Sequence, residues 1–439
     1  MLTFPAGTSA PLVRLGYLAR VQSGITVDAS RQHTEDKVTL PYLRVANVQA
    51  GRLALDSVTE ITVSRTTAAT ATLLPGDVLM TEGGDLDKLG RGTVWRSEIP
   101  VCLHQNHVFA VRPNPRLDPD YLAYLTQSAY ARHYFESTGT KTTNLASTSS
   151  SKIRDFKIPL WPLEKQRRIT DFLDAETARI DQVMSVSRRT IDLLEERRWA
   201  SIYNGVTGQN TSLPKSPRSL GWVDCLPDNW PIVKLNQVAK LGSGHTPSRT
   251  RPEYWENCNI PWISLFDVGS MRNPRQEYLH ETKQQISQLG IDNSSACIHP
   301  AGTVVLSRTA SVGFSTIMAK EMAVSQHFVT WTCGSRLAPA YLLYLLRSMR
   351  QYFESVQVGT TNVTVFMPDL YSIRVPIPSI HQQTEIVQKI RATSGRINQA
   401  VDNLSRQVEL LAERRRALIT AAVTGQFDVS TASGRGVTE

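Results

Sequence analysis

"LLEERRWASIYNGVTGQ", residues 193–209, recurs in closely similar form as "LLAERRRALITAAVTGQ", residues 410–426. The offset of 217 residues continues upstream without a gap, where "IPLWPLEKQRRI" (158–169) matches "VPIPSIHQQTEI" (375–386). An internal repeat of this length is far longer than a solenoid repeat, so it indicates two similar domains in tandem. The chain is therefore interpreted as a duplication.

The duplication extends over the rest of each copy at a slightly different offset. "VRLGYLARVQSG" (13–24) matches "VKLNQVAKLGSG" (233–244), and "PYLRVANV" (41–48) matches "PWISLFDV" (261–268). β-rich runs at 107–113, 302–319 and 325–333 predict strands, and 119–137 and 339–355 predict amphipathic helices with aromatic anchors. The expected fold class is α+β, with a bent sheet in each copy.

The segment boundaries follow from these patterns. Residues 210–229 are rich in proline and serine and predict a linker, and the polar tail at 429–439 is expected to be disordered. The full division is a first globular module at 1–157, a first long helix segment at 158–209, the linker, a second module at 230–374, a second helix segment at 375–428, and the tail.

Each long helix segment carries an apolar seam with steps of four and three residues, which is a heptad pattern. A helix of about 40 residues is roughly 60 Å long and cannot bury its whole stripe on one compact module. We expect the two seams to pair as an antiparallel coiled coil that separates the two modules; the alternative is two helices that each pack on their own module. The seam residues are Leu173, Ile180, Met184, Ile191, Leu194, Ile390, Ile397, Val401, Leu404, Val408 and Leu411.

The overall composition narrows the class of protein. The chain has 439 residues and a formal net charge of +9, which favours an anionic partner such as nucleic acid. No apolar run is long enough for a membrane helix, so we expect no membrane partner. The five cysteines are scattered without a CxxC pair, which favours free thiols in a reducing cytoplasm and no metal site.

Polar loops rich in hydroxyls, glycine and basic residues recur at corresponding places in both copies. Small residues let main-chain N–H groups approach a phosphate, arginine and lysine neutralise it, and asparagine can pair with an adenine edge. Each loop alone is often a plain surface turn. The candidate DNA-binding residues in the second module are Ser243, His245, Thr246, Ser248, Arg249, Arg251, Arg308, Thr309, Ser311, Gln326, His327, Thr360, Thr361 and Asn362. Those in the first module are Ser23, Arg31, Lys88, Arg91, Asn106, His107, Lys141, Thr142, Thr143 and Asn144.

Catalytic motifs are missing from the sequence. It has no GxxxxGK[ST] loop, no dinucleotide-binding glycine motif in the required context, and no Asn/Asp-Pro-Pro-aromatic tetrapeptide. A nuclease could be built on Asp267, Glu281 and Lys283, but acidic-x-Lys triplets arise by chance and the first copy has no counterpart. We therefore expect no catalytic residue in this chain.

Taken together, these motifs resemble the specificity subunit of type I restriction-modification systems. "GSGHTPSR…PEYW…IPWISLFDV" is similar to the start of a target-recognition domain in that family, and the two helix segments are similar to its spacer helices. The first module departs from the pattern, since "QSGITVDASRQ" (22–32) lacks the TPS and PEYW elements.

The resemblance implies a non-catalytic protein whose two recognition domains each read one half of a bipartite site in double-stranded DNA. The coiled coil would set the spacing and dock two methyltransferase (M) subunits, and restriction/translocase (R) subunits would join the complex. S-adenosylmethionine would bind to the methyltransferase subunits, and this chain would bind no cofactor. The alternatives are a coiled-coil scaffold without DNA reading and a nuclease.

Overall fold

The computed structural model describes residues 10–26, 36–84, 89–141, 146–218, 220–358 and 363–429. It divides into two compact units. Unit 1 holds residues 1–187 and 406–439, and unit 2 holds residues 188–405. The division falls inside the two long helices, α5 (Leu163–Val206) and α11 (Ile380–Thr424), so each unit contains one module and one half of each helix.

Unit 1 is built on a four-stranded antiparallel sheet in the order β2-β11-β7-β9. Its strands are β2 (Ala19–Ser23), β11 (Val108–Pro113), β7 (Val78–Thr81) and β9 (Gly92–Val94). A second sheet has the order β10-β3-β6, from β10 (Leu103–His104), β3 (Lys37–Leu43) and β6 (Thr59–Ser64). The smaller strands are β1 (Leu12–Arg14), β14 (Lys157–Pro159), β4 (Val48–Gln49), β5 (Arg52–Leu53), β8 (Gly83–Gly84), β12 (Thr140–Lys141) and β13 (Ala146–Ser147).

Unit 2 repeats this strand order with one further strand at the edge of each sheet. Its main sheet has the order β18-β26-β23-β24-β20, from β18 (Ala239–Ser243), β26 (Phe328–Cys333), β23 (Val304–Ser307), β24 (Ser315–Met318) and β20 (Tyr278–Leu279). The second sheet has the order β21-β19-β25-β22, from β21 (Gln284–Ile286), β19 (Ile260–Ile263), β25 (Met322–Val324) and β22 (Ile298–His299). The matching strand order confirms the α+β duplication expected from the sequence.

The helices differ from the sequence expectation in one respect, because each stretch expected as one helix is divided in two. Ser128 is extended, so it ends α2 (Pro119–Gln127), and its hydroxyl caps α3 (Ala129–Thr138) by accepting from the N–H of Ala131. Met349 likewise separates α8 (Pro339–Ser348) from α9 (Arg350–Val356). The remaining short helices are η1 (Leu15–Tyr17), η3 (Val45–Asn47), α1 (Arg65–Ala71), α4 (Ser150–Asp155), η5 (Leu235–Gln237), η6 (Pro252–Trp255), η7 (Leu265–Asp267), α6 (Val268–Met271), α7 (Gln288–Asp292) and α10 (Met367–Ser372).

The segment expected to be an irregular linker contains a hairpin, which corrects the sequence interpretation. β15 (Lys215–Pro217) pairs antiparallel with β16 (Cys225–Pro227), and β17 (Ile232–Lys234) then pairs with β27 (Arg374–Pro376). The hairpin was missed because proline and serine interrupt any alternating pattern. Of the expected disordered tail, Val429 packs against the unit 1 core, and residues 430–439 lie outside the described residues.

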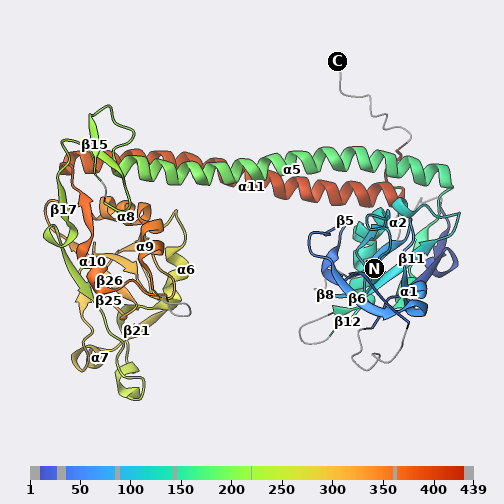
Figure 1. Cartoon of the computed structure of the whole chain (residues 1–439), viewed down its shortest axis with the longest axis horizontal. Coiled ribbons are helices and arrows are strands. Elements are labelled where there is room, and N and C mark those ends of the chain that lie inside the picture. Colours follow the sequence, from blue (N-terminus) through green and yellow to red (C-terminus); the bar gives the residue numbers. More distant parts are fainter. Residues whose placement is uncertain are drawn as a thin grey trace. The chain divides into compact units, whose positions relative to one another are not determined.

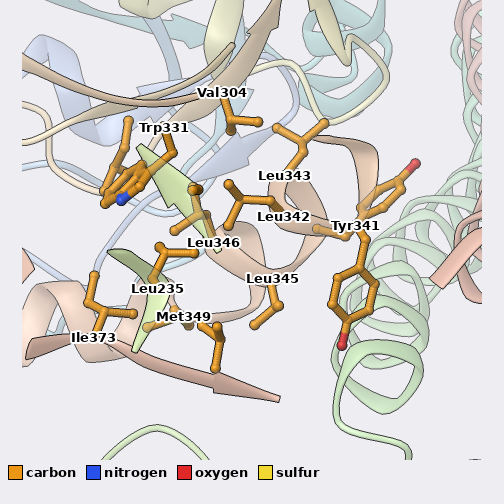
Figure 2. Packing of buried hydrophobic residues seen from close by; sticks show 14 of the residues in the cluster. Leu235, Val304, Trp331, Tyr341, Leu342, Leu343, Leu345, Leu346, Met349 and Ile373 are labelled. Atoms are coloured by element: carbon orange, nitrogen blue, oxygen red, sulfur yellow. The ribbon is translucent and has the colours of Figure 1, made fainter. Parts of the chain in front are cut away.

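The core of unit 2 lies between its main sheet and α8. Trp331 of β26 is fully buried, and Tyr341, Leu342, Leu345 and Leu346 of α8 are fully buried with it (Figure 2). Each buried leucine stabilises the fold by about 1.5–3 kcal/mol relative to an exposed one. This packing fixes the strands whose ends carry the polar loops.

Within each unit the start of one long helix packs against the end of the other, so the pairing is antiparallel (Figure 1). In unit 1, Ile169 and Leu173 of α5 share a core with Ile419 and Val423 of α11. In unit 2 the relation is reversed, since residues near the end of α5 share a core with residues near the start of α11; these are Ile202, Val206, Val387 and Ile390.

The residues of the expected seam are buried or half-buried along both helices. Leu173, Ile180, Met184, Ile390, Ile397 and Val401 are buried, and Ile191, Leu194, Leu404, Val408 and Leu411 are half-buried. The alternative, in which each helix packs only on its own module, is wrong.

The repeated helix ending has a specific contact in each unit. The Tyr121 hydroxyl, in unit 1, donates to the carbonyl oxygen of Val423 at 3.0 Å, near the end of α11. The Tyr341 hydroxyl, in unit 2, donates to the carbonyl oxygen of Val206 at 3.2 Å, at the end of α5. The last carbonyl groups of a helix have no partner within the helix, so these tyrosines satisfy them. Each "VTGQ" ending therefore docks on the module of the other copy, which explains why both copies keep it.

A charged network also joins the second module to α11 inside unit 2. Glu277 accepts from the Arg391 guanidinium, with Nη2–Oε2 at 2.6 Å, and from the Tyr344 hydroxyl at 2.7 Å. Burial raises the pKa of the Glu277 carboxyl, but the hydrogen bonds from Arg391 and Tyr344 outweigh it, so the pKa lies below its ordinary value. This contact fixes the loop before β20 on the helix.

None of the described helices combines the length and the hydrophobicity needed to span a bilayer.

Candidate nucleic-acid interface

Four loops of the second module converge at one end of its main sheet. They are 243–255, 307–314, 325–327 and 363–366, and we call them the loop face. The Thr246 hydroxyl donates to the Gln326 side chain at 2.6 Å, and the main-chain N–H of Arg308 donates to the His327 carbonyl at 2.9 Å. The N–H of Val365 donates to the Arg308 carbonyl at 2.9 Å. The structure thus brings together the candidate residues on these loops.

A glycine at the same place in each copy lets the first loop leave the sheet. A Cβ atom on Gly244 would lie 1.7 Å from the carbonyl oxygen of Val324. A Cβ atom on Gly24 would lie 2.0 Å from the carbonyl oxygen of His104 in the first module. No side chain fits at such distances, so the "SG" pair recognised in the sequence marks a close approach of two main-chain segments.

Arg249 lies on an aromatic platform. Its guanidinium carbon is 3.9 Å from the ring centroid of Trp255 and 5.8 Å from that of Trp262. The two indoles make an edge contact with centroids 5.5 Å apart, and their N–H groups donate to the loop carbonyls of Ser248 (from Trp255, 3.1 Å) and His245 (from Trp262, 3.3 Å). The platform therefore holds both the loop and the arginine.

Arg308 is held in a different way, by main-chain carbonyls. Its Nε donates to the Gln326 carbonyl and its Nη1 to the Val365 carbonyl, both at 3.2 Å. Burial lowers the pKa of Arg308 below its ordinary value, and burial followed by the charge of Arg308 lowers the pKa of His327. Arg308 therefore clamps three loops together, and His327 is favoured in its neutral form.

The other candidates of the second module surround these two arginines. The Ser248 and Thr250 hydroxyls are 2.8 Å apart, and Arg251 is 3.5 Å from Glu253. Ser243 ends β18 and its hydroxyl reaches the Phe328 carbonyl at 3.5 Å, while Thr309 bridges to Thr364. Thr360, Thr361 and Asn362 lie outside the described residues.

Sequence reasoning missed two arginines beside the 307–314 loop. Arg272 donates to the Ser311 hydroxyl at 3.1 Å, and the guanidinium groups of Arg272 and Arg350 lie 5.2 and 4.8 Å from the Phe314 ring centroid. These arginines are distant in sequence from the loop, so no local pattern connected them. The aromatic residues of "PEYW" were the signal that could have identified the platform under Arg249.

The first module repeats the main-chain contacts made by Arg308, with different side chains. The N–H of Glu82 donates to the His107 carbonyl, as the N–H of Arg308 does to the His327 carbonyl. The N–H of Thr148 donates to the Glu82 carbonyl, as the N–H of Val365 does to the Arg308 carbonyl. Glu82 therefore occupies the position of Arg308, and its carboxylate pairs with His107 Nδ1 at 2.5 Å. The structure thus reverses the charge at one equivalent position of the two copies.

The remaining first-module candidates are only partly described. Ser23 ends β2, Asn106 precedes His107 in the turn before β11, and Arg91 precedes β9. Arg31, Lys88, Thr142, Thr143 and Asn144 lie outside the described residues, as does the side chain of Lys141.

Asp267, the buried residue of the three considered for a nuclease, is used structurally. Asp267 is almost fully buried, and its carboxylate accepts from the N–H groups of Ser264 at 2.8 Å and Lys283 at 2.7 Å. A carboxylate occupied by main-chain donors in this way serves a turn. Asp267 and Lys283 therefore stabilise η7 and the strand beside it.

Comparisons with known proteins agree with this geometry. A family model described as the type I restriction modification DNA specificity domain matches residues 12–184 and 227–409. The putative type I restriction enzyme MjaX specificity subunit of Methanocaldococcus jannaschii is 18% identical over 420 residues, covering 94% of this chain and 92% of the relative. The EcoR124I/EcoR124II specificity subunit of Escherichia coli is 22% identical over 182 residues, covering 40% of this chain and 44% of the relative.

Solved structures share the fold at similar identity. A chain from a study of complex assembly and conformational transition of the type I restriction-modification system superposes with a TM-score of 0.73 at 18% identity, covering 97% of this chain and 100% of that one. The HsdS subunit from Thermoanaerobacter tengcongensis superposes with a TM-score of 0.56 at 18% identity, with the same coverage.

Proposed function

This chain belongs to the family of type I restriction modification DNA specificity domains, and we propose that it is the DNA-recognition subunit of a type I restriction-modification complex. It is a binding subunit rather than an enzyme. Each module reads one half of a bipartite site in double-stranded DNA, and the length of the paired helices sets the spacing between the halves.

The observation that carries this proposal is that the main-chain hydrogen bonds around Arg308 recur around Glu82 with different side chains. Arg308 in the second module is replaced by the Glu82–His107 pair in the first. A shared frame suits a shared kind of ligand, and different side chains suit different base sequences, because base edges present different donors and acceptors. Two unlike half-sites are therefore the best fit.

The partners follow from the duplicated helices. Two methyltransferase subunits dock on the two similar helix regions, and these subunits bind S-adenosylmethionine. Restriction/translocase subunits join the assembled complex. The equivalent helix endings at Val206 and Val423 support two equivalent docking places.

The test is selection from a random duplex library by the full chain in complex with its methyltransferase subunits. The expected result is a motif with two defined halves, and an affinity that falls steeply with salt because phosphate contacts release counterions. A coiled-coil scaffold without DNA reading predicts no enriched motif and a flat response to salt.

The nuclease alternative is tested with the chain alone. Incubation with DNA, Mg²⁺ and S-adenosylmethionine should give neither cleavage nor methyl transfer. The buried position of Asp267 is the observation against it.

A further inference from the structure

We infer that Arg249 is the guanine-reading side chain of the second module, and that Trp255 is the residue that positions it. The inference rests on the proposed function, because it names a base that the loop face would recognise. It assigns Arg308, by contrast, to holding the loop face together.

The first step is the orientation of Arg249. Its guanidinium carbon lies 3.9 Å from the Trp255 ring centroid, so the charged group is held against an aromatic ring rather than extended into solvent. The ring is itself fixed, because its N–H donates to the Ser248 carbonyl and its edge contacts Trp262. A positioned guanidinium loses less conformational entropy on forming two parallel hydrogen bonds than a free one does.

The second step is the hydrogen-bonding capacity that Arg249 retains. Among the described residues, the polar partner of its guanidinium is the Gln284 side chain, at a long 3.4 Å from Nη2, and no carboxylate lies within 4.0 Å of it. The nearby Arg251 has Glu253 at 3.5 Å. The exposed guanidinium of Arg249 therefore keeps donors for an external acceptor.

The third step separates Arg249 from Arg308. Arg308 uses Nε and one Nη1 hydrogen on the Gln326 and Val365 carbonyls, so two of its donors already hold the protein together. Loss of those bonds would leave the loops unjoined rather than change one base contact. Arg249 is the arginine of the loop face whose charged group is both oriented and open.

The fourth step distinguishes a base from a phosphate. Arginine pairs bidentately with guanine O6 and N7, and this contact needs the planar fork. A phosphate contact needs mainly the positive charge, which lysine also supplies. The aromatic platform orients the fork, which favours the base contact.

The experiment compares Arg249→Lys with Arg251→Lys as the matched control, each as the full chain with its methyltransferase subunits. Both variants keep the charge, and both positions are exposed, so folding is not at issue. Bound duplexes are selected from a random library and sequenced. Arg249→Lys should reduce the preference for one G·C pair in one half-site by about 5- to 150-fold, which corresponds to about 1–3 kcal/mol. Arg251→Lys, in the same loop but paired with Glu253, should change no single base preference, and any loss of binding should fall on all sequences alike.

Trp255→Leu tests the positioning role, because Arg249 is retained while its platform is removed. It should weaken the preference at the same G·C pair more than at any other position, which a general loss of stability would not produce. Arg249→Ala removes the charge together with the guanidinium. A base contact predicts a position-specific loss, whereas a phosphate contact weakens all sequences alike and lowers the salt slope by about one.

Two results would overturn the inference or its premise, and they are distinguishable. A wild-type library without an enriched motif overturns the proposed function itself. A wild-type motif that Arg249→Lys leaves intact at every position overturns the guanine assignment and leaves the proposed function standing.

Discussion

The buried tyrosines at the helix ends give a sharp prediction, because the two copies differ in one hydrogen bond. In unit 2, the Tyr341 hydroxyl is the donor found for the Val206 carbonyl within the described residues, at 3.2 Å. In unit 1, the Val423 carbonyl accepts from Tyr121 at 3.0 Å and also from the indole N–H of Trp161 at 3.3 Å. Burial raises the pKa of both tyrosine hydroxyls above the ordinary value, so they remain donors.

The magnitudes follow from what each substitution leaves behind. The Tyr341 hydroxyl also reaches the Pro376 carbonyl at 3.2 Å, so Tyr341→Phe takes this donor from two carbonyls, at a cost of about 1–3 kcal/mol for each one left unsatisfied. The Tyr121 hydroxyl also reaches the Pro159 carbonyl at 2.9 Å, but Trp161 still donates to Val423 in Tyr121→Phe, so one carbonyl loses its donor, at a cost of about 1–3 kcal/mol. The distances alone would suggest the opposite order, since the Tyr121 bond is shorter, but the retained donor has the larger effect. We therefore expect Tyr341→Phe to be the more destabilising change.

The assay is denaturant-dependent hydrogen exchange followed by mass spectrometry, which reports each unit separately. Tyr341→Phe should lower the opening free energy of peptides in unit 2, and Tyr121→Phe that of peptides in unit 1. Tyr371→Phe is the control, because its side chain is half exposed. Losses no larger than that of the control, or a larger loss for Tyr121→Phe, would refute the reasoning. A double variant with Trp161→Phe should raise the cost of Tyr121→Phe to that of Tyr341→Phe.

Three further predictions concern the acidic network, the loop glycine and the helix length. Glu277→Gln should destabilise the chain at pH 7, and the difference from wild type should shrink as the pH falls below about 4. A carboxyl whose folded pKa is lowered contributes stability that is lost as it becomes protonated. Melting temperatures across this pH range check the prediction, and a difference independent of pH would count against the network. Gly244→Ala should disrupt the loop face, since the new methyl group would lie 1.7 Å from the Val324 carbonyl oxygen. Gly395→Ala in α11, where the methyl group would meet no neighbouring atom within 4 Å, should instead stabilise the helix by about 0.5–1 kcal/mol. Equal effects of the two variants on thermal unfolding would contradict this. Inserting four residues at Met184 should lengthen α5 by about 6 Å and shift its heptad phase, so the spacing between the recognised half-sites should change. Library selection that returns the original spacing would exclude a spacing role for the helices.

Much of the fold was readable because its signals are local or repeated. The seam from Leu173 to Met184 follows a heptad, and both helices end before a glycine with positive φ, Gly208 at 69° and Gly425 at 76°. The segment 302–319, expected as strand, is a hairpin of β23 and β24 in which residues 308–314 form the loop. The sequence interpretation found the right segment but not the turn, because hydrophobic residues continue on both sides of the loop.

The candidate interface was located by the sequence but not resolved into roles. "GSGHTPSRTRPEYW" marked the loop, yet Arg249, Arg251 and Arg308 are equivalent as letters. Their differences come from Trp255, Glu253 and two main-chain carbonyls, respectively. Such neighbours are set by the packing of separate strands.

The sequence by itself determined that the chain is duplicated, that each copy is an α+β module followed by a long amphipathic helix, and that the two helices share one pattern. Those properties are carried by spacing along the chain. Only the tertiary structure decided that each helix ends on the module of the other copy, as the contacts of Tyr121 with Val423 and of Tyr341 with Val206 establish. The reason is physical: a helix end needs donors for its last carbonyls, and which donor meets them depends on how segments distant in the chain pack together.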